Sequence, residues 1–243
     1  EKPGSMWLRM IAAGGGGGLT FEQPEMNIVR GAYYALISAL SGTQTMALCS
    51  FDEAYTIPTE YSARISLRTM QILIEEMGLT ETVDPLGGSF YVETMTNRMR
   101  AKMEEIMAEV DAAGGIVKLV SDGTIQAKVS EQAYRMQRNI ESGAFPKVGV
   151  NCYRNEKEED HPVEFHPYNE EDARLQIESL NRVRAERDEA QVARALARVS
   201  ADARSGVNLM PAIVEAVKAY ASVGEITREM VQGFGRYREP IRF

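Results

Sequence analysis

Short apolar runs alternate with longer amphipathic stretches in the first part of the chain. Residues 6–13 and 45–50 are largely apolar, which is typical of strands buried on both faces of a parallel sheet. Residues 81–84 form a third, shorter candidate strand. Each run precedes a stretch with apolar residues at helical spacing, and these stretches are 24–40, 59–77 and 90–113. This order, with short links, predicts parallel strand–helix–strand units.

Five consecutive glycines, residues 14–18, follow the first predicted strand. Because glycine has no side chain, such a loop can lie close against a ligand or a neighbouring loop. A flexible linker is the alternative interpretation, and the sequence favours neither of the two. The run lacks the GxGxxG and GxxxxGK spacings, so it is weak evidence for phosphate binding.

The pattern becomes predominantly helical after residue 113. The predicted helices lie within 116–120, 124–142, 169–204, 210–222 and 224–234, whereas 148–168 has little helical pattern. We therefore divide the chain into residues 1–113, which carry the strand–helix units, and residues 114–243, a helical region. The charges of 169–204 indicate solvated surface. The acid in 224–227, GEIT, fits ordinary helix capping rather than catalysis.

Charge and cysteine content narrow the function classes. A net charge of −8 and a pI near 5.0 do not provide the positive surface that general nucleic-acid binding requires. The uncharged stretch 31–51 is interrupted by the polar residues 41–45, so we expect no membrane span, and the first residues do not read as a signal peptide. Cys49 and Cys152 are too few for a disulfide framework and are expected as free thiols, which favours a cytoplasmic protein.

The sequence shows no readable catalytic constellation. A GxSxG motif is absent, and the carboxylates of Asp52 and Glu53 are adjacent in sequence rather than on one helical face. His161 and His166 lie in a polar stretch that contains prolines, which predicts a solvated loop rather than a metal site. We therefore assign no catalytic side chain and no metal ligand from the residues alone.

Several motifs in a fixed order resemble one family. They are NIVR, GTQT, SFDEA, PTEYSAR and DPLGGSFYVE, followed by GAFPKVGVNCY and ASVGEITREM. Together they are similar to the catalytic subunit of the methylmalonyl-CoA mutase family, the adenosylcobalamin-dependent acyl-CoA mutases. The resemblance covers nearly the whole chain and is far more specific than any one of the motifs.

The resemblance implies the C-terminal portion of a (β/α)8 TIM barrel, followed by a helical region. Three strand–helix units cannot close a barrel, which needs eight, and the chain begins inside a strand-like run without methionine. We expect the remaining strands, with the family's histidine over the corrin and its CoA contacts, to lie upstream. The implied reaction is a radical 1,2-rearrangement of an acyl-CoA, such as methylmalonyl-CoA to succinyl-CoA or a related pair, and the implied cofactor is adenosylcobalamin.

The resemblance also assigns three cofactor-binding residues. Arg30, Tyr34 and Ile37 correspond to the inward face of the helix that touches the adenosyl group in the family, and their spacing places them on one helical face. The family has Glu or Gln at the position of Tyr34, and it reads His-Thr-Asn at residues 47–49, where this chain has Ala-Leu-Cys. These departures indicate that a different acyl-CoA could be the substrate. From the residue alone, a core aromatic of an amphipathic helix is the favoured interpretation of Tyr34, and the family position is what indicates a binding role.

The resemblance implies two partners, an acyl-CoA substrate and a separate cobalamin-binding small subunit, because the DxHxxG-type motif of the cobalamin domain is absent from this sequence. The altered positions leave one alternative open, a non-catalytic accessory homologue that assembles with a true mutase. We expect residues 1–243 to be inactive alone.

Overall fold

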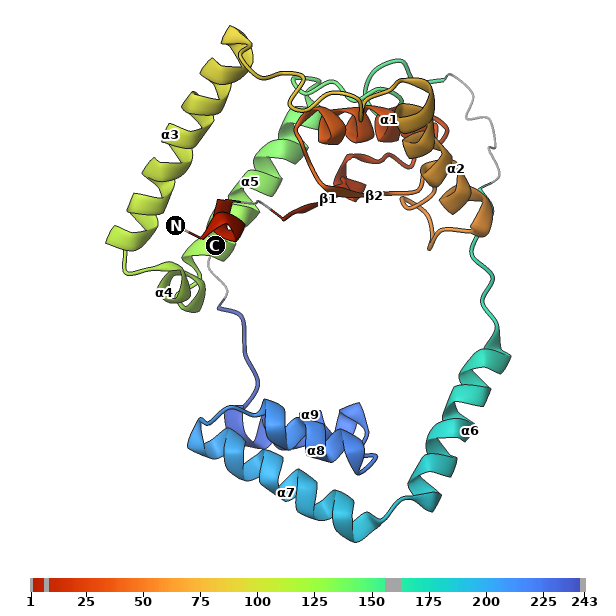
Figure 1. Ribbon diagram of the computed structural model, residues 1–243, viewed down its shortest axis with the longest axis vertical. Helices are drawn as coiled ribbons and strands as arrows, with labels where there is room; N and C mark the ends of the chain where they lie inside the picture. The colour runs from red at the N-terminus through yellow and green to blue at the C-terminus, as the bar shows by residue number, and fades with distance from the viewer. Residues whose placement is uncertain (1, 7–8, 156–162, 241–243) are drawn as a thin grey trace. The chain divides into compact units, whose positions relative to one another are not determined.

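The computed structural model describes residues 2–6, 9–155 and 163–240 (Figure 1). The chain forms two compact units, the first running to Pro167 and the second comprising Tyr168–Pro240. The boundary predicted at residue 113 is a different division from that between the two compact units, and it stays a prediction.

A parallel pair of strands forms the sheet of the first unit, after a 3-10 turn at Pro3–Met6. Strand β1 (Ile11–Gly14) pairs with β2 (Thr45–Leu48), with Ile11 opposite Thr45 and Gly14 opposite Leu48. A Cβ on Gly14 would lie 2.8 Å from Leu48 Cδ1 and 3.3 Å from Leu48 Cα, so glycine favours the close packing at this end of the pair. The predicted α/β class with parallel strands is confirmed for these two strands.

Two expectations about the strands are wrong. The strands are not buried on both faces, because Gly14 is the one buried residue in β1 and β2. The sheet has two strands in the described residues, so each strand is an edge strand. The third predicted strand, residues 81–84, is a series of bends and turns. Its single aliphatic residue, Val83, is 95% exposed, and Asp84 has a φ of 48°, which breaks extended structure.

Helices α1 (Met26–Leu40) and α2 (Glu60–Gln71) pack against each other and against β2. Helix α1 buries Asn27, Gly31 and Ala35, one residue per turn, and at Gly31 the helix comes close to the side chain of Leu48. Helix α2 begins with a capping box between Thr59 and Ser62 and continues into a π-helical turn, η3 (Ile72–Glu76). Both helices were predicted from their apolar spacing.

The remaining helices of the first unit also match the predicted segments. They are α3 (Phe90–Ala112), capped by Ser89, α4 (Ile116–Ser121) and α5 (Thr124–Glu141). His166 lies in an exposed loop, as predicted, where its main-chain N–H donates to Thr56 Oγ1 over 3.1 Å. His161 lies outside the described residues.

The second unit consists of helices. Its members are α6 (Glu170–Glu186), α7 (Glu189–Ser205), α8 (Met210–Lys218) and α9 (Val223–Phe234). The core is built from Val199 on α7, Ala212 and Ala216 on α8, and Ile226 on α9. The stretch 169–204 forms two helices rather than one. Asp188 accepts a hydrogen bond from the main-chain N–H of Gln191 and so begins a new helix.

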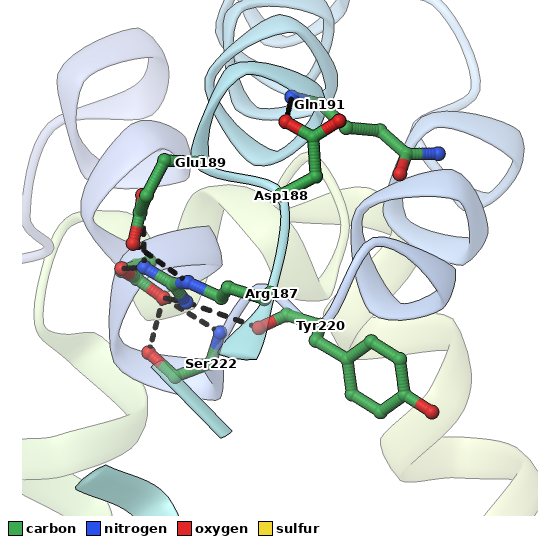
Figure 2. Close-up of polar contacts among 7 residues, drawn as sticks. Arg187, Asp188, Glu189, Gln191, Tyr220 and Ser222 are labelled. Carbon is green, nitrogen blue, oxygen red and sulfur yellow. Dashed lines mark hydrogen bonds and ion pairs between the residues drawn. The ribbon is translucent and has the colours of Figure 1, made fainter. Parts of the chain in front are cut away.

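Arg187 fills the corner between α6 and α7 (Figure 2). Its guanidinium donates to both carboxylate oxygens of Glu225, at 2.7 and 2.9 Å, and to the carbonyl oxygen of Tyr220 at 3.0 Å. Glu225 also accepts from the main-chain N–H and hydroxyl of Ser222, each at 2.7 Å. The predicted capping role of this acid is confirmed. The hydrogen bonds from Arg187 hold the pKa of the Glu225 carboxyl well below its usual range.

In the part of the chain that the structure describes, no helix combines the length and apolar character needed to cross a bilayer.

Candidate functional site

A cavity of about 630 Å³ lies within the first unit. It is bounded by the glycine loop, by one face of α1, by the last turns of α5 and by the segment that follows α5. The lining residues are Gly17, Gly18, Met26, Val29, Arg30, Tyr33, Tyr34, Met136, Ile140, Phe145, Pro146, Lys147 and Val148. The volume and mixed apolar and polar lining are typical of small-molecule sites.

Helix α1 supplies the largest part of this lining. Met26, Val29, Arg30, Tyr33 and Tyr34 recur three or four residues apart and therefore share one face of the helix. Because Asn27, Gly31 and Ala35 are buried in the unit, one face of α1 packs in the core and another face lines the cavity.

The glycine loop packs directly on Tyr34. Residues Gly16–Gly18 form a 3-10 turn, and a Cβ on Gly18 would lie 2.0 Å from the Tyr34 hydroxyl oxygen. A Cβ on Gly16 would lie 3.7 Å from Cys49 Sγ. Of the two interpretations that the sequence leaves open, the structure shows the loop lying against its neighbours rather than a free linker.

Arg30 is held by three hydrogen bonds to the chain itself. Its Nη1 donates to Thr20 Oγ1 at 2.7 Å and to Asn27 Oδ1 at 2.8 Å, and its Nη2 donates to the carbonyl oxygen of Val148 at 2.8 Å. The amide nitrogen of Asn27 donates in turn to the carbonyl oxygens of Thr20 and Phe51. This network fixes the exit of the glycine loop, the start of α1 and the loop after β2 relative to one another.

The loop after β2 carries thiol and carboxyl groups beside the glycine loop. Burial and the neighbouring Glu53 raise the pKa of the Cys49 thiol, so the sulfur is neutral near pH 7. Glu53 also accepts a 2.7 Å hydrogen bond from the main-chain N–H of Ser50. Asp52 is 1% exposed, and its Oδ1 has no hydrogen-bond partner among the described residues.

The structure places two of the three predicted site residues at the cavity. Arg30 and Tyr34 both line the cavity, whereas Ile37, one turn further along α1, is 63% exposed and is not part of the lining. Sequence reasoning gave no role to residues 145–148, although they form the opposite wall. The signal was present, since GAFPKVGVNCY is one of the motifs that carry the family resemblance.

The lining can bind and orient a ligand. It offers two phenol groups, one ammonium, one guanidinium and the main chain of the glycine loop, and it contains no carboxylate or imidazole among its described residues. Such a set suits an apolar, partly flat ligand with a few polar groups. In the described residues, no group of three His, Cys, Asp or Glu side chains could hold a metal ion.

The parallel pair of strands and the helices packed on it are those of an α/β fragment, and the lining of its cavity suits a small molecule. The family model described as methylmalonyl-CoA mutase matches residues 1–236, and the chain belongs to that family.

Curated relatives match nearly the whole chain. It is 42% identical over 240 residues to the 2-hydroxyisobutanoyl-CoA mutase large subunit of Aquincola tertiaricarbonis, covering 98% of this chain and 42% of that protein. It is 42% identical over 243 residues to methylmalonyl-CoA mutase of Cereibacter sphaeroides, covering all of this chain and 34% of that protein. Identity to methylmalonyl-CoA mutase of Escherichia coli is 37% over 240 residues, which is 99% of this chain and 34% of that protein. The chain therefore spans less than half the length of these relatives.

Proposed function

We propose that the complete protein to which this chain belongs is an isomerase that rearranges the carbon skeleton of an acyl-CoA with adenosylcobalamin. Family membership and relatives named as mutases support this proposal. The barrel is likewise a proposal, in which the parallel pair β1 and β2 contributes neighbouring strands of a (β/α)8 cylinder, residues 1–113 hold its last units and residues 114–243 form the helical region.

The observation that carries the proposal is the cradle formed by Gly18 and Tyr34. The phenol lies where any side chain at residue 18 would have to be, so the main chain of the loop and the Tyr34 ring meet at the cavity. The residues fit a nucleoside-like group, because aromatic and methionine side chains suit a flat base, and phenol groups can donate to or accept from ribose hydroxyls. Arg30 and Tyr34 are the residues of this chain that would hold the adenosyl group. Ile37 lies one turn further along the same helix.

The chemistry that adenosylcobalamin supplies when bound is homolytic cleavage of its cobalt–carbon bond, which starts the radical rearrangement. The residues described here would bind and orient the adenosyl group and exclude water from it. Arg30, already engaged by Thr20, Asn27 and Val148, would keep α1 and the opposite wall in place around the ligand.

The proposed substrate is methylmalonyl-CoA or a related acyl-CoA. Leu48, one of the four residues that depart from the family pattern, packs onto Gly14 and Gly31. Its bulk therefore fills the contact between helix and strand rather than a ligand site. Cys49 faces the glycine loop as a neutral thiol beside the carboxyl of Glu53. We propose that a separate cobalamin-binding small subunit completes the enzyme, a proposal supported by a relative named as a large subunit, and that the enzyme is cytoplasmic.

The test is to produce the complete protein with its candidate small subunit and adenosylcobalamin. We expect an absorption band of bound cobalamin. We also expect conversion of an acyl-CoA ester, which chromatography of the CoA products would detect. If neither band nor conversion is seen with a panel of branched, carboxylated and hydroxylated acyl-CoA esters, the proposal is wrong and an accessory role takes its place.

A further inference from the structure

Residues 145–153 form a hydrogen-bonded loop after α5. Its residues Phe145, Pro146, Lys147 and Val148 line the cavity opposite α1. Three of these four side chains are apolar, so the wall that they form suits contact with an uncharged part of a ligand.

Asn151 determines the shape of this loop. Its Oδ1 accepts a 2.6 Å hydrogen bond from the main-chain N–H of Lys147, and its Nδ2 donates to the carbonyl oxygens of Ile140 at 2.7 Å and Phe145 at 2.8 Å. One side chain thus satisfies three main-chain groups and joins the end of α5 to Phe145 and Lys147 of the wall. Gly149 has a φ of 84°, which favours glycine at the turn.

Two side chains, one just before α1 and one on it, fasten the loop to the other wall. Arg30 donates to the carbonyl oxygen of Val148, and Gln23 Nε2 donates to the carbonyl oxygen of Tyr153 at 3.1 Å. A Cβ on Gly149 would lie 3.3 Å from Gln23 Cδ, so the loop approaches Gln23 closely. The width of the cavity is therefore set by hydrogen bonds between main chain of the loop on one side and the side chains of Gln23 and Arg30 on the other.

We propose that residues 145–148 form the second wall of the coenzyme site and that Asn151 is the positioning residue that holds this wall in place. The inference rests on the proposed function, because it takes the cavity at Arg30 and Tyr34 as the site of the adenosyl group. Without the three Asn151 hydrogen bonds, the wall would move away from α1 and Arg30 would lose a fixed acceptor. Binding of the ligand would then have to order the site, and this cost would lower the affinity.

The experiment uses the complete protein with its small subunit and compares Asn151→Ala with Asn169→Ala. Asn169 is a matched control because it also accepts a hydrogen bond from a main-chain N–H, at the start of α6, and it lies in the other compact unit. For Asn151→Ala we expect the Kd for adenosylcobalamin, measured by absorbance titration, to rise about tenfold. The KM for the acyl-CoA that the wild type converts should stay within about twofold in both variants.

An unchanged coenzyme Kd in Asn151→Ala, or an equal rise in Asn169→Ala, would overturn the inference while leaving the proposed function intact. A wild-type protein that binds no adenosylcobalamin would overturn the proposed function and the inference with it. If Asn151→Ala does not fold, the variant Gln23→Asn tests the inference in its place. Asparagine tolerates the positive φ of 49° at residue 23 but is too short to reach Tyr153, so its Kd should rise as well. An unchanged Kd in that variant would likewise overturn the inference.

Discussion

Arg30 and Val148, which are 118 residues apart in the sequence, are joined by a 2.8 Å hydrogen bond from the guanidinium to the main-chain carbonyl. The same guanidinium binds Thr20 and Asn27. Because its donors have a fixed planar arrangement, Arg30 can connect three segments that a more compact cation could not reach together.

Replacing Arg30 by lysine should therefore destabilise the protein although the charge is kept. An ammonium at the end of a shorter chain cannot reach all three acceptors, and we expect a loss of about 1–2 kcal/mol in the free energy of unfolding. Urea unfolding followed by circular dichroism measures it. Arg64→Lys is the control, since Arg64 is exposed on α2 with only a 3.9 Å ion pair to Glu60. An equal loss in both variants would contradict the connecting role.

Gly18→Ala should displace the Tyr34 ring. The new methyl group would overlap the phenol oxygen, so either the loop or the ring must move, and the coenzyme Kd should rise about tenfold or more. Gly17→Ala provides the comparison, because a Cβ there meets nothing within 4 Å. Absorbance titration of both variants with adenosylcobalamin checks this expectation, which fails if the two variants bind equally well.

Tyr34→Ala should weaken coenzyme binding without unfolding the protein. The ring is half-buried and lies at the cavity, so its loss removes ligand contact area rather than a core residue. Tyr34→Phe separates the two contributions of this side chain. If the ring packs on the ligand, phenylalanine keeps most of the affinity, and if the hydroxyl binds a ribose, phenylalanine behaves like alanine. Wild-type affinity in Tyr34→Ala would remove Tyr34 from the site.

Glu225→Gln should make the stability of the second unit less dependent on pH. The pKa of Glu225 is depressed from an ordinary value of 4.5, so the pair with Arg187 contributes stability above pH 4.5, and this contribution is lost as the pH falls toward the folded-state pKa. The Arg187 and Glu225 side chains are only 5% and 16% exposed. We expect glutamine to cost about 2 kcal/mol at pH 7.

Urea unfolding between pH 3 and pH 7 provides the measurement, with Glu178→Gln as the exposed control on α6. The wild type should lose more stability than Glu225→Gln as the pH falls. Parallel pH profiles for the wild type and Glu225→Gln would show that the pair is not coupled to folding.

The helices and the two strands could be predicted because their signals are local. The apolar spacing of α1 and the uninterrupted apolar run of β2 depend only on neighbours within a few residues. The false third strand at 81–84 had one aliphatic residue, too few to hold a strand in place. The break at Arg187 could have been found from Asp188, which is followed by Glu189 and Gln191 as in a capped helix start.

The cavity could be predicted only in part. Arg30 and Tyr34 came from the family resemblance, and the face of α1 that they share follows from helical geometry. The opposite wall depends on Asn151 binding main-chain groups of Lys147, Phe145 and Ile140, and on Arg30 reaching a carbonyl 118 residues away. Contacts to main-chain atoms leave no trace in side-chain patterning, so hydropathy could not reveal them.

The Arg187 corner limits how this part of the chain can vary in evolution. Glu225 begins α9 by binding Ser222 and at the same time neutralises the cation that closes the turn between α6 and α7. Exchange of either charged residue alone would disturb two turns at once. Substitutions at residues 187 and 225 should therefore be inherited together, or be accompanied by apolar replacements that fill the corner without charge.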